Sequence, residues 1–117
     1  MRTLLALVLL PGSALAADCP FSSSISDANG MLGRAETAYA ELDVDGFDAA
    51  LDELSLSLQC LDERMPGPTA ARVHRMHALR SFIAGDDAEW VESLRAAKVL
   101  QPDYAFPDTL LPANHPL

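Results

Sequence analysis

Apolar side chains recur along the middle of this chain every three or four residues, which is the spacing of an amphipathic helix. One stripe covers 28–42, and after the turn 43–46 a second covers 47–61. Two further stripes cover 73–83 and 90–100. No useful length of sequence alternates apolar and polar residues as a half-buried strand does. The pattern predicts an all-α fold with about four helices in two antiparallel pairs.

Polar residues and helix breakers at the ends of these stripes predict where the helices begin and end. The run 65–68, Met-Pro-Gly-Pro, cannot continue a helix, so we expect it to link the two pairs. The expected first residues or caps are Ser24, Ser26 or Asp27 in the Ser-rich segment 17–27, Thr69 for the third helix, and Asp86 or Asp87 for the fourth, with Gly85 ending the third.

The first sixteen residues have the pattern of a secretory signal peptide. Arg2 precedes the apolar run 4–10, a Pro-Gly breaker follows, and 14–16, Ala-Leu-Ala, is a small-residue cleavage site. No later stretch approaches the roughly 20 apolar residues of a transmembrane helix. Asp18 stands before Cys19 where a lipoprotein signal needs a small residue. We therefore expect an exported soluble domain, periplasmic or secreted, of about 100 residues.

The chain has two cysteines, and both would remain after cleavage. An even count in an exported protein favours a disulfide between Cys19 and Cys60, which would tie the N-terminal segment to the end of the second helix. Two unpaired buried thiols are the alternative, because sequence alone does not bring their Cβ atoms together.

Charge is distributed unevenly. The formal net charge is -9, and 18–63 holds eleven acidic residues against the single base Arg34. Such acidity argues against nucleic acid or an anionic membrane as the partner, since either would repel this half of the chain.

The second helical pair resembles a tetratricopeptide repeat, a 34-residue helix-turn-helix unit. The resemblance rests on the segment from Ala71 to Pro102, with Ala78, Gly85-Asp86 and Ala97 at the positions of small and turn residues. The first pair matches through Ala38, 45–47 and Ala50. Together they cover the segment 28–102, a four-helix domain.

Two repeats are fewer than such arrays normally need, because the last repeat leaves an apolar face without a neighbour. The Pro-rich tail 103–117 contains Tyr104, Phe106, Leu110 and Leu111, which makes it too apolar for a free linker. We expect the tail to fold back onto the last helices, with docking into a second copy or another protein as the alternative.

The resemblance implies a concave surface lined by the first helix of each pair. Its expected lining includes Leu32 and Ala35, and the expected partner-binding residues are Tyr39, Arg72, Arg75, Leu79 and Phe82. The two arginines could hold a carboxylate or an acidic peptide. Alternatively they pair with Glu89 or Glu92 or are simply solvated.

Two sets of residues have the spacing of possible metal ligands. The run 41–52 resembles a calcium-binding EF-hand loop, with Glu41, Asp43, Asp45 and Asp52 as oxygen ligands, but its opening Glu41 and closing Asp52 depart from that motif and favour an ordinary acidic inter-helix turn. His74 and His77 lie one helical turn apart and could bind a transition metal with His115 or an acid, or could pack against the fourth helix.

The sequence contains neither a Gly-rich phosphate loop nor a lone reactive cysteine, so neither feature supports a catalytic role. We expect a non-catalytic protein-protein interaction or assembly module of the cell envelope that binds a protein segment in a helical groove and needs no cofactor. A calcium-dependent binding module and a self-associating secreted structural protein, a homo-oligomer, remain the alternatives.

Overall fold

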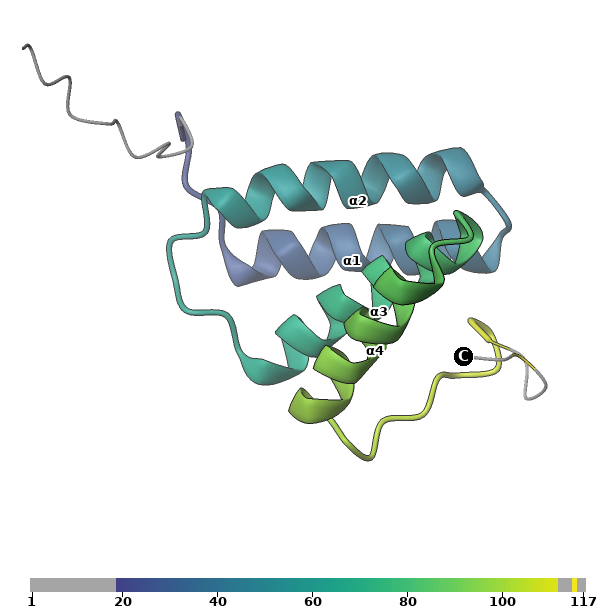
Figure 1. Ribbon diagram of the computed structural model, residues 1–117. Coiled ribbons are helices and arrows are strands. Elements are labelled where there is room, and N and C mark those ends of the chain that lie inside the picture. Colours follow the sequence, from purple (N-terminus) through teal and green to yellow (C-terminus); the bar gives the residue numbers. More distant parts are fainter. Residues whose placement is uncertain (1–18, 112–114, 116–117) are drawn as a thin grey trace, which may run out of the picture.

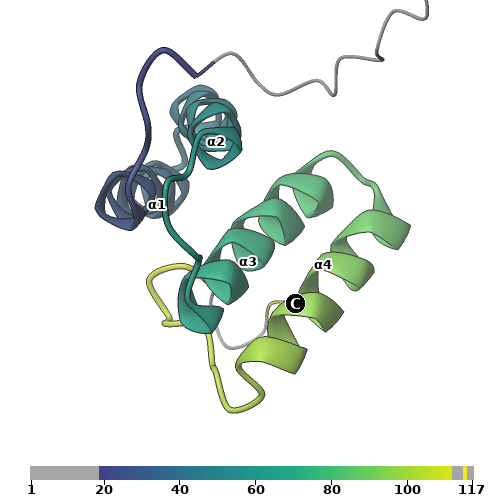
Figure 2. The same ribbon diagram turned by 90° about the vertical axis from the view of Figure 1, so that its left-hand side faces the viewer.

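The computed structural model describes residues 19–111 and 115, and in this part of the chain it is all-helical. The four helices are α1 (Ile25–Ala40), α2 (Val44–Gln59), α3 (Gly67–Ile83) and α4 (Asp87–Leu100). Helix α1 packs against α2, and α3 packs against α4 (Figure 1). The second hairpin crosses the first instead of continuing along it, as the view along α1 and α2 shows (Figure 2). The predicted fold of two helix pairs is confirmed.

Helices α1, α2 and α4 begin at polar caps, and two of these, Ser24 and Asp86, were among the predicted ones. The hydroxyl of Ser24 accepts the N–H of Asp27 at 3.1 Å, and the Asp27 carboxylate accepts the N–H of Ser24 at 2.9 Å. This reciprocal pair satisfies two N–H groups at the start of α1 and lowers the pKa of Asp27. The Asp43 carboxylate caps α2 and the Asp86 carboxylate caps α4. Gly85 ends α3 with a φ of 75°, as predicted.

Helix α3 begins earlier than predicted. The sequence indicated a linker over 65–68 and a cap at Thr69, but α3 begins at Gly67 and Pro66 takes the cap position. Pro68 is accommodated because the first turn of a helix has no intrahelical partner for its N–H groups. Thr69 is therefore a buried residue of the first turn, and the linker is shorter than expected.

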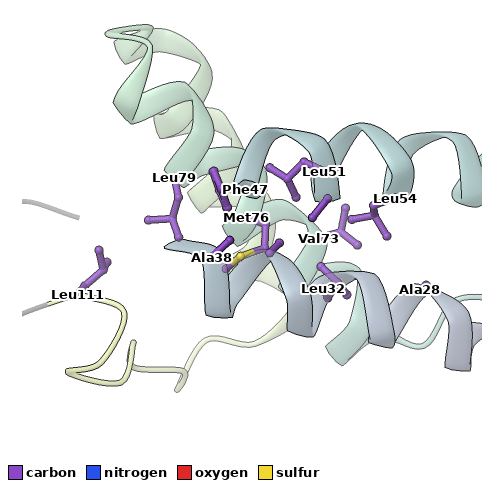
Figure 3. Close-up of a cluster of buried hydrophobic side chains, with 12 residues drawn as sticks. Ala28, Leu32, Ala38, Phe47, Leu51, Leu54, Val73, Met76, Leu79 and Leu111 are labelled. Carbon is purple, nitrogen blue, oxygen red and sulfur yellow. The ribbon is translucent and has the colours of Figure 1, made fainter. Parts of the chain in front are cut away.

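The hydrophobic core lies between the two hairpins. The largest fully buried side chains come from α1, α2 and α3: Leu32, Phe47, Leu51, Leu54, Met76 and Leu79. Figure 3 shows these side chains converging between the helices, together with the small residues that let the helices approach. On α4 the buried side chains are Ser93 and Ala97, so α4 contributes mainly to its own hairpin.

The N-terminal segment is fixed to the end of α2. Cys19 and Cys60 form the predicted disulfide, with Cα atoms 5.5 Å apart. Beside it, the N–H of Ser23 donates to the Cys60 carbonyl at 2.8 Å and the N–H of Asp62 donates to the Ser23 carbonyl at 2.9 Å. The Ser57 hydroxyl donates to the Ser23 hydroxyl at 2.7 Å. One covalent and three hydrogen bonds thus close the first hairpin at its open end.

The described part of the tail folds back onto the helices, as predicted. Leu111 is buried and belongs to the hydrophobic cluster, and Phe106 packs against that cluster. Figure 3 shows Leu111 at the edge of the cluster on the side of Leu79. The rings of Tyr104 and Phe106 meet edge to face at 5.5 Å. Residues 112–114 and 116–117 lie outside the described part of the chain.

The expected signal peptide, 1–16, also lies outside the described residues. None of the helices that the structure describes is both long enough and apolar enough to cross a membrane.

Candidate partner-binding surface

The five predicted partner-binding residues lie on the first helix of each hairpin. Tyr39 is near the end of α1, and Arg72, Arg75, Leu79 and Phe82 follow one another along α3. Arg75 and Leu79 are buried, while the other three are half-buried. We call the surface formed by these five residues the inner surface. It is partly covered by the protein's own tail.

Arg75 is the most unusual residue of the inner surface, because its side chain carries a charge and yet the residue is only 5% exposed. Its Nη1 donates to the Gln101 side-chain oxygen at 2.9 Å. Its Cζ lies 3.5 Å from the centroid of the Tyr104 ring. Burial lowers the pKa of Arg75, yet a guanidinium stays charged, so the aromatic face and the amide replace part of its lost hydration.

Arg72 has a different role, because it joins the two hairpins. Its Nε forms an ion pair with the Glu36 carboxylate of α1. The alternative prediction, that Arg72 pairs with Glu89 or Glu92 of α4, is wrong. Glu92 pairs with Arg95 of its own helix. The Glu36 carboxylate partly neutralises Arg72, which makes this arginine less attractive to a carboxylate from a partner.

Aromatic rings meet at the end of the inner surface where α1 and α3 finish. Tyr39 contacts Phe47 edge to face, with ring centroids 5.4 Å apart. The ring centroid of Phe82 lies 6.0 Å from that of Trp90 of α4 and 4.9 Å from that of His115. Burial raises the pKa of Tyr39.

Leu79 belongs to the same buried cluster as Leu111 of the tail. Tyr104, Leu111 and His115 thus place tail residues against three of the five predicted residues. A half-open cavity of about 400 Å³ lies between α3, α4 and the tail. Its lining includes Arg75, Leu94, Lys98, Tyr104, Phe106 and Leu111. Of the five predicted residues, Arg75 is the one that lines this cavity. Leu32 and Ala35, which were expected to line the groove, are instead fully buried in the core.

The EF-hand hypothesis does not fit the backbone. Such a site needs a twelve-residue loop, but α2 begins at Val44, so the larger part of 41–52 is helical. Glu41 ends α1, Asp43 caps α2, and Asp45 lies in the first turn of that helix. Residues 41–43 form the ordinary acidic inter-helix turn that the sequence favoured, and 44–52 belong to α2.

The last carboxylate of that run has a structural partner that sequence analysis missed. Arg80 of α3 contacts Asp52 at 2.9 Å and Asp48 at 3.2 Å. The two aspartates lie one turn apart on α2, and this spacing was the available signal for a shared basic partner. Together with the Arg72–Glu36 pair, this contact holds α3 against both helices of the first hairpin.

The histidine pair on α3 is half-buried. Burial, and to a lesser extent the charge of Arg80, lower the pKa of His77 and favour its neutral form. Among residues 19–111 and 115, no three His, Cys, Asp or Glu side chains are grouped so that they could hold a metal ion. The metal hypothesis based on His74 and His77 therefore finds no third ligand in the described part of the chain.

Comparisons with protein-family models, with curated proteins and with solved structures found no match to this chain.

Proposed function

We propose that this protein is a non-catalytic interaction or assembly module of the cell envelope, which binds an extended protein segment on the inner surface in place of its own tail. One observation carries the proposal: an irregular, Pro-containing segment of the chain lies on this surface, with Tyr104 against Arg75 and Leu111 in the cluster of Leu79. A surface that accommodates one such segment has the shape to accommodate another.

The contacts of the tail indicate what a partner segment must supply. Arg75 needs an aromatic ring over its guanidinium, because removal of Tyr104 would leave a buried charge with fewer partners. The cluster around Leu79 needs an apolar side chain in the place of Leu111. The predicted ligand is thus an extended segment with an aromatic residue followed at a distance by a branched apolar one, and not the acidic peptide that two free arginines would have favoured.

The tail also sets how tightly a partner must bind. A tethered segment competes at an effective concentration in the millimolar range. Only molecules whose tail has left the surface can bind a partner there. The apparent affinity for the partner is therefore the intrinsic affinity multiplied by the fraction of such molecules. A partner must therefore bind better than the tail does, or first displace it.

Three features support an envelope location. The segment 1–16 has the pattern of a secretory signal, the disulfide between Cys19 and Cys60 is of the kind that persists in oxidising compartments, and the acidic charge suits a soluble exported protein. The two consecutive hairpins, with the predicted residues on the first helix of each, support the resemblance to tetratricopeptide repeats.

The test compares three mature, disulfide-intact baits in native envelope extract: the wild-type chain, the double variant Tyr104→Ala/Leu111→Ser, and the control Val99→Ala. The double variant weakens the tail but keeps the whole chain, whereas Val99 is exposed on α4 and lines no part of the cavity. The proposal predicts a protein that the double variant recovers in larger amount and that a free 103–117 peptide releases.

A peptide with the same residues in scrambled order is the matched competitor. If every protein recovered is recovered equally by the three baits, or is released equally by both peptides, the inner surface is not the binding site. If the released protein is a second copy of the chain, the tail exchanges between copies and the self-associating alternative is correct; sedimentation of the wild type would then show a dimer.

A further inference from the structure

The turn between α1 and α2 holds a leucine in an unfavourable backbone conformation. Leu42 has a φ of 60°, and in the described part of the chain it is the one residue other than glycine with a positive φ. Its N–H donates to the Tyr39 carbonyl at 3.1 Å, and the N–H of Asp43 donates to the Ala38 carbonyl at 2.8 Å. This pair of bonds ends α1 in the manner that normally uses glycine.

The second hairpin makes the same turn with glycine. Gly85 has a φ of 75°, its N–H donates to the Phe82 carbonyl at 3.1 Å, and the N–H of Asp86 donates to the Ser81 carbonyl at 2.9 Å. In each hairpin the next residue is the aspartate that caps the following helix. Leu42 thus stands where the other half of the same molecule has the residue that this backbone favours.

The side chain of Leu42 does not compensate for this conformation by packing in the core. It is 87% exposed, so its burial contributes little to folding. A residue that strains the backbone and yet points into solvent suggests a role in binding.

Leu42 lies at the mouth of an apolar pocket of about 430 Å³. Val44 and Ile83, both exposed, line the same pocket, and Tyr39, Phe47 and Leu110 also contribute to its lining. The end of α1, the start of α2, the end of α3 and the tail meet here. This pocket, which we call the Leu42 pocket, can take one large apolar side chain.

The charges around the pocket have one sign. Asp43 and Asp108 line it together with His115, and none of the described residues of the lining is a lysine or arginine. Glu41 and Asp45, both exposed, flank Leu42 in the sequence. A second copy of this acidic chain would bring like charges together, whereas a basic segment would be attracted.

We propose that the Leu42 pocket docks a short protein segment that presents one large apolar side chain between lysine or arginine residues. The apolar side chain enters the pocket against Leu42, Val44 and Ile83, and the flanking bases face Asp43 and Asp108. This second interface goes beyond the proposed function. It needs the tail in place, because Asp108 and Leu110 line the pocket, whereas the proposed function displaces the tail.

The experiment uses the whole mature protein and a labelled nonapeptide with a central leucine flanked on each side by glycine and lysines. Binding is followed by fluorescence anisotropy and by NMR shifts of the pocket residues. The expected result is binding in the high micromolar range for this probe. A peptide with alanine in the centre should bind at least fivefold more weakly, and one with glutamates for lysines should not bind.

Two substitutions of the protein separate binding from strain. Leu42→Gly removes both the side chain and the unfavourable conformation, whereas Leu42→Ala removes only the side chain. Both should weaken the leucine peptide at least fivefold, but only Leu42→Gly should raise the folding equilibrium constant, by about fivefold. Leu56→Ala is the control, since Leu56 is exposed on α2 but does not line the pocket.

Retention of full affinity in Leu42→Gly, equal binding of the leucine and alanine peptides, or no binding of the leucine peptide at millimolar concentration would each overturn the proposal.

Discussion

The guanidinium of Arg75 lies over the ring of Tyr104, with its Cζ 3.5 Å from the ring centroid. The two residues belong to α3 and to the tail, so this contact crosses from the helical domain to the segment that covers it. Arg75 is almost completely buried and Tyr104 is partly exposed. The tail thus covers the guanidinium of Arg75, which the helices alone would leave more exposed to solvent.

Replacement of the aromatic ring should weaken the fold measurably. Tyr104→Ala is expected to lower the free energy of unfolding by about 1 kcal/mol, the usual size of a partly exposed cation-π contact. Tyr104→Phe keeps the ring and should lose less than half of that amount. Urea unfolding followed by circular dichroism measures both. Equal losses in the two variants would show that the hydroxyl, and not the ring, makes the contact that matters.

The disulfide should provide a large share of the stability. It spans 41 residues of sequence, and in the chain-entropy model a loop of this size contributes about 4 kcal/mol. Cys19→Ser and Cys60→Ser should each lower the free energy of unfolding by about that amount, and the double variant should lose no more than either single one. Urea unfolding at 25 °C, with and without reductant, provides the measurement. A wild-type protein that reductant does not destabilise would contradict the prediction.

Stability should fall as the pH drops below the ordinary histidine pKa of 6.5, because burial lowers the pKa of His77 in the folded state. In the window between the two pKa values, the unfolded chain binds a proton that the folded chain does not, so acid favours unfolding. Above pH 6.5 both states are neutral at this residue and its contribution is constant. Urea unfolding from pH 7.5 to 5 should show this decline in the wild type and in the control His74→Gln, but a smaller one in His77→Gln. Equal declines in all three would exclude His77 as the source.

Two glycine-to-alanine substitutions should change the free energy of unfolding in opposite directions. An added Cβ would meet no atom within 4 Å at either Gly85 or Gly30, so sterics with neighbours play no part. Gly85 has a positive φ, and Gly85→Ala should cost about 1 kcal/mol. Gly30 lies inside α1, where Gly30→Ala should stabilise by about 0.5 to 1 kcal/mol. Thermal unfolding of the pair checks the prediction, which fails if both shifts have the same sign.

The helices and their pairing followed from the sequence because they depend on local chemistry. Apolar spacing located all four helices, Gly85 ended α3, and Ser24 was among the candidate caps. The start of α3 was missed because a proline that breaks a helix interior is tolerated in a first turn. The acidic turn after α1 was ambiguous because the same carboxylates serve as helix caps and as calcium ligands.

The burial and the contacts of the inner-surface residues could not be predicted from the sequence in the same way. Spacing placed Arg75 and Leu79 on the correct helix, but their burial depends on Tyr104 and Leu111, which lie about 30 residues further along the chain. The partners of Arg72 and Arg80 likewise depend on how the two hairpins cross. Periodicity places a residue on a helix, whereas such contacts follow from the arrangement of the whole fold.

The central claim is that the inner surface binds extended segments and that the tail competes for it. The most direct measurement is the affinity of a labelled 103–117 peptide for the full mature chain and for its Tyr104→Ala/Leu111→Ser variant, with circular dichroism confirming that both are folded. The account predicts that the variant binds the peptide at least tenfold more tightly, because its tethered tail competes less. Equal affinity for the two proteins, or no binding to either, would contradict it.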